Sequence, residues 1–335
     1  MRPQPTEQNS RRARPKLPLL ISYAYLREEP STVERVMSSP DVELLVDSGA
    51  FTALNAGSEI VLEDYCSFLH KYHDSIFRYI ALDKLMDPEQ TDRNLRAMLA
   101  SGLRPVPVHV LGDDERRMDE LFEVSDYVAL GGLRRPHRGP APPSYLKKKM
   151  EWAKGRKVHW LGYTWKPMLQ ALRPFSCDCS SWIGGAMYGR VAIYLGAGKW
   201  ATFTRPQLLE TRAYLREDVR RAVHSYGFTI EQLLDERHWH NGNRKAELKA
   251  GDCMITQLPA RSWVRYVIDF RLRFGTRFFL ACHGTQVPWL TAAYEQVTAS
   301  GRFEFEDQNF RDDDVRGLPP VEASAAGGRV SQDAS

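Results

Sequence analysis

Short apolar runs rich in β-branched residues recur between residues 17 and 198, and segments with a helical spacing of apolar residues separate them. This alternation is typical of βα units on a parallel sheet. The predicted strands are 17–25, 43–51, 78–83, 104–111, 126–133, 157–164, 174–182 and 190–198. Eight strands with short crossovers predict a (β/α)₈ TIM-type barrel, and a doubly wound open sheet is the alternative.

Amphipathic helices are predicted between the strands, at 31–39, 62–75, 87–102 and 113–124. The third has clear end signals, because Asp87 stands at the N-cap position, Pro88 at the first helical position and Gly102 just past the last turn. From residue 204 the pattern becomes helical and rich in aromatic residues. We therefore expect a basic disordered tail (1–16), a barrel catalytic core (17–203), a C-terminal helical region packed on the barrel (204–316) and a disordered tail (317–335).

Composition narrows the class of protein. The chain has 335 residues, of which 43% are hydrophobic, and a formal charge of only +4, so it is not a polycationic nucleic-acid coat. No apolar run is long enough to span a membrane, and the first residues lack the apolar stretch of a secretory signal. The five cysteines are irregularly spaced, which favours reduced thiols. We expect a soluble, cytoplasmic protein, in the host cytoplasm if a phage encodes it.

Three acidic residues end or interrupt the predicted strands. Asp47 ends ELLVD, Asp83 ends YIALD, and Asp178 lies between two cysteines in FSCDCSSW. In a barrel, the carboxyl ends of the strands face the active site. Alternation along the strand turns Cys177 and Cys179 opposite to Asp178, so if the cysteines pack outward, this carboxylate points into the barrel mouth.

A single aspartate at a strand end commonly caps a helix or closes a turn. Three at one mouth would raise one another's pKa values, an arrangement associated with acid, base or nucleophile chemistry. Glycosyl transfer is a reaction class that uses carboxylates without a metal. Gly131 and Gly132 would add backbone donors at close range, and Gly162 would let a flat ligand approach. No phosphate-binding loop motif accompanies them.

Five segments together resemble the tRNA-guanine transglycosylase superfamily. They are DSGAF at 47–51, ALD at 81–83, ALGGL at 129–133, WLGYT at 160–164 and FSCDCSSW at 175–182. The similarity covers roughly residues 17–200 and is greatest to the DNA-modifying, DpdA-type branch found in phages and bacterial DNA-modification clusters. The resemblance implies an enzyme that exchanges guanine for a 7-deazaguanine, most simply 7-cyano-7-deazaguanine, without a cofactor. It implies DNA as the partner, with tRNA as the alternative.

The resemblance also implies roles for individual residues. Asp178 would attack C1′ of the nucleotide, while Asp47 would hold the base edge and shuttle its proton. Asp83 would accept hydrogen bonds from N1–H and the 2-amino group of guanine. The remaining base contacts would come from Ser48, Phe51, Gly131, Gly132 and Leu161. Because a paired guanine cannot reach such a pocket, the nucleotide must be flipped or single-stranded.

Two departures from the family pattern concern a metal and a base contact. The tRNA enzymes carry a Cys-x-Cys-x-x-Cys and His zinc site, whereas here Cys253, Cys282 and His283 are scattered, with His238 and His240 elsewhere. We expect no metal, and zinc in the C-terminal region is the minor alternative. A glutamine that binds O6 is replaced by the HVLG segment, where His109 would substitute.

A basic segment follows the fifth predicted strand. Between residues 134 and 157 there are nine basic side chains and one acid, which predicts a phosphate track beside the mouth or, alternatively, a solvated helix face. The residues expected to contact the nucleic-acid backbone are Arg134, Arg135, Lys147, Lys148 and Lys149. Two further classes stay open: a non-catalytic barrel that binds nucleic acid, and a hydrolase of small nucleosides. Oligomeric state is not predicted.

Overall fold

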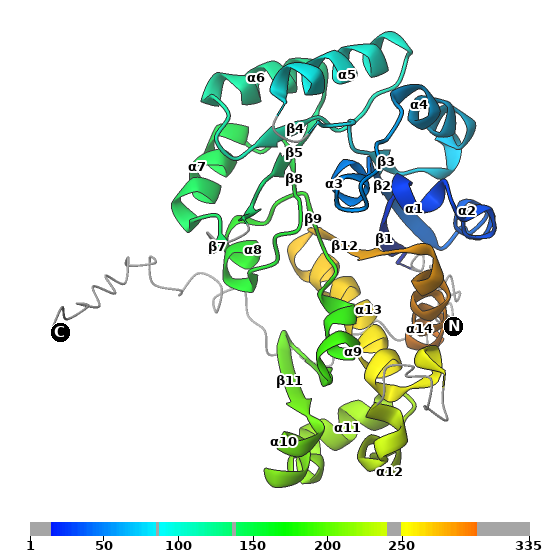
Figure 1. Ribbon diagram of the computed structural model, residues 1–335. Coiled ribbons are helices and arrows are strands. Elements are labelled where there is room, and N and C mark those ends of the chain that lie inside the picture. Colours follow the sequence, from blue (N-terminus) through cyan, green and yellow to red (C-terminus); the bar gives the residue numbers. More distant parts are fainter. Residues whose placement is uncertain (1–14, 85–86, 136–138, 240–248, 300–335) are drawn as a thin grey trace, which may run out of the picture. The chain divides into compact units, whose positions relative to one another are not determined.

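Eight parallel strands form one curled sheet, whose labelled strands lie at the centre of Figure 1. The computed structural model describes residues 15–84, 87–135, 139–239 and 249–299. The strands are β1 (Leu17–Ser22), β2 (Val42–Asp47), β3 (Arg78–Tyr79), β4 (Val108–Val110), β5 (Tyr127–Gly131), β8 (Lys157–Trp160), β9 (Ser176–Cys179) and β12 (Arg277–Cys282). Their order across the sheet is β3-β2-β1-β12-β9-β8-β5-β4.

The two outer strands of this order approach each other at one point. An isolated parallel bridge pairs Ile80, just after β3, with Val106, just before β4. Val106 N–H donates to the Tyr79 carbonyl at 2.8 Å, and Ala81 N–H donates to the Val106 carbonyl at 2.9 Å. The architecture is therefore a mixed α/β fold whose parallel sheet curls until its outer strands meet locally.

The eighth strand differs from the sequence prediction. Residues 190–198 were expected to provide it, but β10 (Arg190–Gly196) pairs antiparallel with β11 (Lys199–Thr204) in a separate hairpin. Its place in the curled sheet is taken by β12, which lies between β9 and β1. The sheet thus takes a strand from beyond residue 203, within the region expected to be helical. The short connection after β9 explains the error, because a parallel neighbour needs a longer crossover.

Helices cover the outside of the sheet. They are α1 (Tyr23–Leu26), α2 (Pro30–Met37), α3 (Ala50–Asn55), α4 (Leu62–Lys71), α5 (Pro88–Ala100), α6 (Glu115–Val124), α7 (Pro143–Ala153), α8 (Lys166–Leu172) and α14 (Val287–Thr298). All four helices predicted from the sequence are confirmed within a few residues. In α5, the Asp87 side chain accepts the Gln90 N–H at 2.9 Å, as the expected N-cap should.

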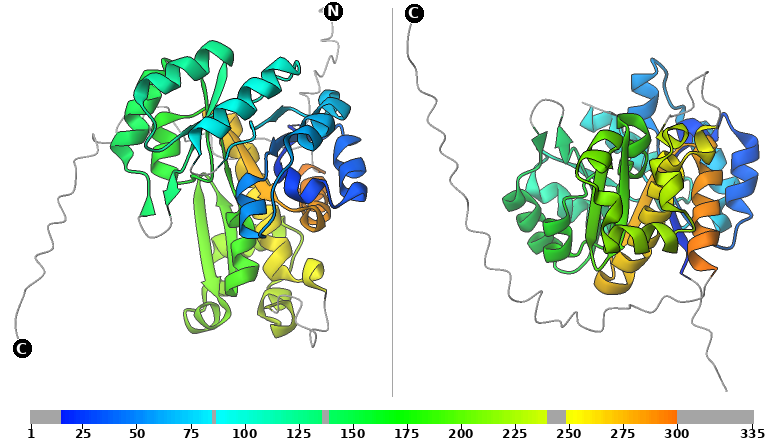
Figure 2. Two further views of the ribbon diagram at one scale, coloured as in Figure 1. Left: turned by 45° about the horizontal axis from the view of Figure 1, so that its top comes forward. Right: turned by 90° about the horizontal axis from the view of Figure 1, so that it is seen from below.

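The chain between β9 and β12 forms a group of elements at the bottom of Figure 1. It contains α9 (Gly184–Tyr188), the β10–β11 hairpin, α10 (Arg205–Glu210), α11 (Glu217–Ser225), α12 (Ile230–Leu234) and α13 (Met254–Phe274). The long helix α13 packs against β10, β12 and α14, and Figure 2 shows it beside the hairpin. Short 3₁₀ turns occur at His73–Ser75, Ser181–Ile183, Ala213–Leu215, Glu236–Trp239, Ala250–Asp252 and Gly284–Gln286, and β6 (Arg134–Arg135) pairs with β7 (Gly139–Pro140).

The two faces of the curled sheet have separate cores. One apolar cluster includes strand residues and the helices, whereas a smaller one draws only on strands and their ends, so it fills the inside of the curl. The inner cluster consists of Leu20, Leu45, Ile80, Val106, Val108, Tyr127, Ala129 and Phe279. At the amino end of the strands, buried Glu43 pairs with Arg271 at 2.8 Å and Arg277 at 3.3 Å, which closes this end. The carboxyl end of the strands is therefore the end at which we expect a functional site.

The described residues all lie in one compact unit. Apart from Pro15 and Lys16, the predicted tails 1–16 and 317–335 fall outside the described residues. None of the helices that the structure describes combines the length and the apolar character needed to cross a bilayer.

Candidate functional site

The three aspartates singled out in the sequence occur at the carboxyl edge of the curled sheet. Asp47 is the last residue of β2, Asp83 follows β3 closely, and Asp178 is the third residue of β9. The Asp47 carboxyl interacts electrostatically with both of the others. The structure therefore brings together the three acids that the sequence placed on separate strands.

A tight turn after β2 holds Asp47. Its Oδ2 accepts the Gly49 N–H at 3.1 Å, and Gly49 has a positive φ of 84°. A Cβ at this position would lie 2.7 Å from Ser22 Oγ and 2.8 Å from the Ala24 backbone nitrogen, so only glycine fits. The chain then turns into α3, which leaves the Phe51 ring 62% exposed. The backbone turn of the DSGAF motif thus positions the Asp47 carboxyl and leaves the Phe51 side chain exposed.

Ser48 points toward Asp83. The buried Ser48 hydroxyl donates to Asp83 Oδ1 at 3.1 Å. Burial raises the pKa of Asp83, and this hydrogen bond lowers the pKa in part. The Ser48 hydroxyl therefore orients the neighbouring carboxylate, and its expected contact with a base stays a prediction.

Asp47 is a fully buried acid whose pKa departs from its ordinary value. Burial, followed by repulsion from Asp83 and Asp178, raises its pKa to about 7, although the Gly49 N–H opposes this change. A carboxylic acid with this pKa can both give and take a proton near neutral pH. The site therefore contains a carboxyl group that is partly protonated near neutral pH.

Asp178 points to the inside of the curl. The cysteines on either side of it, Cys177 and Cys179, are buried in the cluster that includes the helices, so they face outward as the sequence pattern required. Asp178 Oδ1 accepts the Gly162 N–H at 2.8 Å and lies 3.1 Å from His159 Nε2. Gly162, with a φ of 63°, aims its amide at this oxygen from the end of β8. The carboxylate is anchored through one oxygen.

His159 is a site residue that the sequence reasoning missed. It is fully buried in β8, is the register partner of Ser176 in β9, and contacts both Ser176 and Asp178. A signal was present, since alternation in KVHWL puts His159 and Leu161 on one face of the strand. The same argument that placed Asp178 inside the sheet would have placed this imidazole beside it.

Gly131 and Leu161 meet at the rim of the inner face. A Cβ added to Gly131 would lie 2.9 Å from Val108 Cγ1 and 3.8 Å from Leu161 Cδ1, so the absence of a side chain lets Val108 pack closely against this end of β5. Gly132 is exposed, with a φ of 68°. These positions are compatible with a flat ligand lying against the backbone.

The expected role of His109 is corrected by the structure. Val108 belongs to the inner cluster, so the next residue faces outward, where His109 Nε2 lies 3.3 Å from Lys149 Nζ on α7. Burial and the Lys149 charge lower the pKa of His109. This imidazole belongs to the layer between sheet and helices and does not reach the carboxylates.

The basic segment is not one continuous phosphate track. Lys149 is only 3% exposed and interacts with His109, whereas Lys147 and Lys148 are exposed on α7. Further along, Arg156 pairs with Asp119 and Lys157 with Asp126. Both pairs lie toward the amino ends of the strands, away from the acids. Arg134 and Arg135 form β6, and the placement of their side chains is outside what the structure describes.

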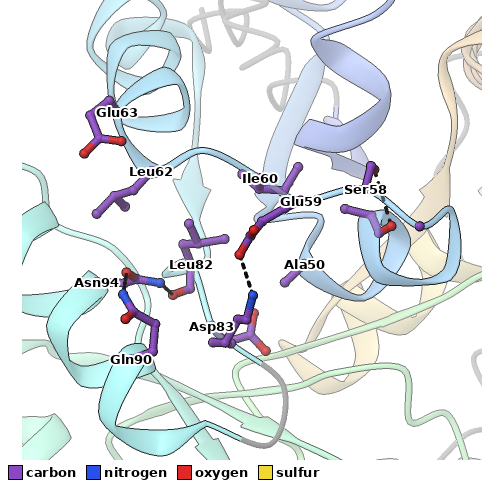
Figure 3. A pocket seen from close by; sticks show the side chains of 13 residues that line it. Ala50, Ser58, Glu59, Ile60, Leu62, Glu63, Leu82, Asp83, Gln90 and Asn94 are labelled. Carbon is purple, nitrogen blue, oxygen red and sulfur yellow. Dashed lines mark hydrogen bonds and ion pairs between the residues drawn. The ribbon is translucent and has the colours of Figure 1, made fainter.

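A cavity of about 690 Å³ lies beside Asp83 (Figure 3). Asp83 lies in its wall, together with Gln90 and Asn94 of α5 and the ion pair between Lys84 and Glu59. Asn94 Nδ2 donates to the Leu82 carbonyl at 3.0 Å, which fixes the chain that carries Asp83. Asp47 and Asp178 are not among its lining residues. The cavity therefore extends the site on the side of Asp83.

Metal ligation has no visible site in the part of the chain that the structure describes, where no three His, Cys, Asp or Glu side chains are grouped to hold an ion. Cys253 and Cys282 are both buried free thiols, and His240 lies outside the described residues. The expectation that the protein works without a metal stays a prediction.

Comparison with known proteins adds no assignment. No family model matches the chain, and no curated protein matches it. The resemblance to the transglycosylases therefore stays a prediction.

Proposed function

We propose that this protein is a transglycosylase that replaces guanine in DNA with a 7-deazaguanine through a covalent intermediate on Asp178. The observation that carries the proposal is the pair of unlike carboxyl environments at one sheet edge. Asp47 has its pKa raised to about 7, whereas Asp178 has an oxygen held by a backbone N–H and an imidazole. Base exchange requires this division, with one group to move a proton and another to bond to the sugar.

The first displacement breaks the glycosidic bond. Asp178 forms a bond from its carboxylate oxygen to C1′ while the C1′–N9 bond breaks and its electron pair leaves with the purine. Asp47 in its acid form gives a proton to the departing base. A pKa of about 7 leaves a large share of Asp47 protonated at neutral pH, so the leaving group departs uncharged.

The second displacement reverses these roles. N9 of the incoming 7-deazaguanine attacks C1′, the ester bond to Asp178 breaks, and the Asp47 carboxylate takes the proton from N9. Two displacements at one carbon give net retention of configuration. The side-chain inventory closes the cycle without a redox or nucleotide cofactor.

Base recognition is assigned to the Asp83 side of the site. With its Oδ1 bound to the Ser48 hydroxyl, the Asp83 carboxylate is oriented at the cavity wall, where it can accept the two N–H groups of a guanine edge. The 690 Å³ cavity leaves room beyond that edge. Gly131 and Leu161 would flank the base on the opposite side of the mouth.

Exposed aromatic side chains support a nucleic-acid substrate. Phe51 follows β2, Trp165 follows β8 and is 47% exposed, and Tyr188 follows β9 and is 69% exposed. All three come after carboxyl ends of sheet strands, the same edge as the acids. Stacking on such rings stabilises unpaired bases by about 1–3 kcal/mol each. A flipped guanine and the bases next to it could stack on these rings at the carboxyl edge of the sheet.

The proposal includes closure of the sheet as a (β/α)₈ barrel. The Ile80–Val106 bridge and its two hydrogen bonds join the outer strands, which supports a closed ring around the inner core. A ring of eight strands would gather the carboxyl ends of β2, β3 and β9 around one mouth.

Covalent trapping tests the proposal. The protein is incubated with a guanine-containing DNA oligonucleotide, quenched in denaturant and run on a denaturing gel. We expect a shifted band for the wild type and for Asp74→Asn, an exposed aspartate before β3, and none for Asp178→Asn. Release of free guanine should accompany the band.

The same assay separates the other functional classes. A band with RNA but not with DNA would assign the tRNA reaction. Tight DNA binding with neither band nor guanine release would identify a non-catalytic binder. Guanine release from free guanosine, unaffected by DNA, would identify a nucleoside hydrolase.

A further inference from the structure

Behind Asp178, a chain of buried polar side chains crosses the inside of the sheet. His159 Nδ1 lies 2.5 Å from Ser176 Oγ. The Ser176 hydroxyl is hydrogen-bonded to the Tyr127 hydroxyl, and Tyr127 Oη lies 3.5 Å from the same imidazole nitrogen. These three residues come from β8, β9 and β5, and none is more than 1% exposed. The chain ends at the mouth on Asp178 Oδ1.

The three residue types of a Ser-His-Asp hydrolase are present here in the opposite spatial order. Ser176 is fully buried beneath the imidazole, whereas Asp178 is 7% exposed at the carboxyl edge. No substrate can reach Ser176 Oγ, so the serine is not the nucleophile. The three buried polar residues instead act on Asp178, which His159 contacts.

The acceptors within reach of two hydroxyl protons fix the direction of this chain. Within the described structure, the Tyr127 hydroxyl contacts only Ser176 Oγ and His159 Nδ1, and the Ser176 hydroxyl contacts only Tyr127 and the same Nδ1. Both protons find acceptors only if Nδ1 carries none. If Nδ1 were protonated, one buried hydroxyl proton would have no acceptor, which is unfavourable.

The protons on the imidazole follow from this constraint. With Nδ1 as acceptor, His159 is neutral and carries its proton on Nε2, which donates to Asp178 Oδ1. Tyr127 stays a neutral donor, because burial raises the pKa of its phenol far above the physiological range. Within the described residues, the other ring in contact with His159 is that of Phe279 on β12, two strands away in the sheet, and it bears no charge.

We propose that His159, Ser176 and Tyr127 form a one-way donor chain that positions Asp178 for attack and assigns Oδ2 as the nucleophilic oxygen. Oδ1 already accepts both the Gly162 N–H and the His159 N–H. No side chain or amide in the described ranges donates to Oδ2. This assignment rests on the proposed function for its catalytic consequence, although the direction of the chain does not. His159 is thus a positioning residue.

Nitrogen NMR tests the chain independently of activity. In ¹⁵N-histidine-labelled full-length protein, His159 is identified by its loss in His159→Gln. We expect the Nε2–H tautomer for His159, with a large change at Nδ1 in Ser176→Ala. A protonated Nδ1 in the wild type would overturn the donor chain whatever the enzyme does.

Kinetics test the positioning role. We expect His159→Leu to slow adduct formation with guanine DNA by about 10- to 100-fold at unchanged DNA affinity. His159→Gln, whose amide N–H can replace the Nε2 donor, should restore at least half of that loss on a logarithmic scale. Equal rates in the two folded variants would overturn the positioning role, because a packing residue gains nothing from a restored N–H.

The two experiments also separate the proposals. An Nε2–H signal from His159 together with a wild type that forms no adduct would reject the transglycosylase and keep the donor chain.

Discussion

The Ser48 hydroxyl donates a hydrogen bond of 3.1 Å to Oδ1 of Asp83, across from β2 to the end of β3. This contact links the turn that carries Asp47 to the carboxylate proposed to read the base. Asp83 is therefore oriented by the same motif that supplies the proposed proton carrier, so base recognition and proton transfer depend on one local fold.

Removing the Asp83 charge should separate base recognition from DNA binding. We expect Asp83→Asn to slow guanine release by about 100-fold, because an amide can accept only one of the two N–H groups. DNA affinity, measured by fluorescence anisotropy, should change less than threefold. Ser48→Ala should slow release by about tenfold, whereas Ser225→Ala on α11 serves as the control. Equal losses of release and binding would identify Asp83 as a structural residue.

The raised pKa of Asp47 predicts a pH-dependent cost to stability. Its pKa is about 7 in the folded protein and near 3.8 when unfolded, so the unfolded chain loses this proton first and stability falls as pH rises from about 4 to 7. Asp47→Asn removes the cost. We expect the variant to gain roughly 2 kcal/mol more at pH 8 than at pH 5 in urea unfolding.

The control for this experiment is Asp74→Asn, which changes an exposed carboxyl. Its free energy of unfolding relative to the wild type should differ little between the two pH values. An Asp47→Asn variant with the same small difference would contradict the assignment of a raised pKa to Asp47.

Gly49 should tolerate no side chain. Gly49→Ala combines a positive φ with a Cβ inside contact distance of Ser22 and Ala24, so we expect a loss of about 2–4 kcal/mol in unfolding free energy. Gly155→Ala is the matched control, because Gly155 has a φ of 80° but open space around its Cα. It should cost about 1 kcal/mol. Equal costs would show that the turn can shift to admit a methyl group.

The lysines of α7 should differ sharply in their effects on DNA binding and stability. Lys147 and Lys148 are exposed, so replacing both by alanine should lower the salt dependence of DNA binding by about one ion per residue without loss of stability. Lys149→Ala should instead destabilise the fold, because its buried amine contacts His109. A salt slope unchanged in the double variant would show that α7 does not contact DNA.

Local signals predicted the strands and helices of the first 180 residues well. Apolar runs bounded by turns gave seven of the sheet strands, and the capping residues Asp87 and Pro88 marked the start of α5. Alternation about Asp178 indicated that its carboxylate faces inward. These features are set by residues close together in the sequence, so a local sequence pattern can predict them.

The errors involved partners distant in sequence. The apolar run RFFLAC was read as part of a helical segment, although Gly275, with a φ of 73°, ends α13 just before it. Nothing in the run itself shows that it pairs with β9 and β1. His109 and Lys149 were likewise expected to contact the substrate, because the sequence does not reveal that their side chains contact each other.

The position of β12 has a consequence for synthesis of the chain. This strand lies between β1 and β9 but is the last strand of the sheet to leave the ribosome. Until it arrives, the nascent protein carries two unpaired strand edges in what will become the middle of its core, and such edges invite association with other chains. The strand that carries the aspartate proposed to form the covalent bond gains β12 as its second neighbour only after residue 282 has been synthesised.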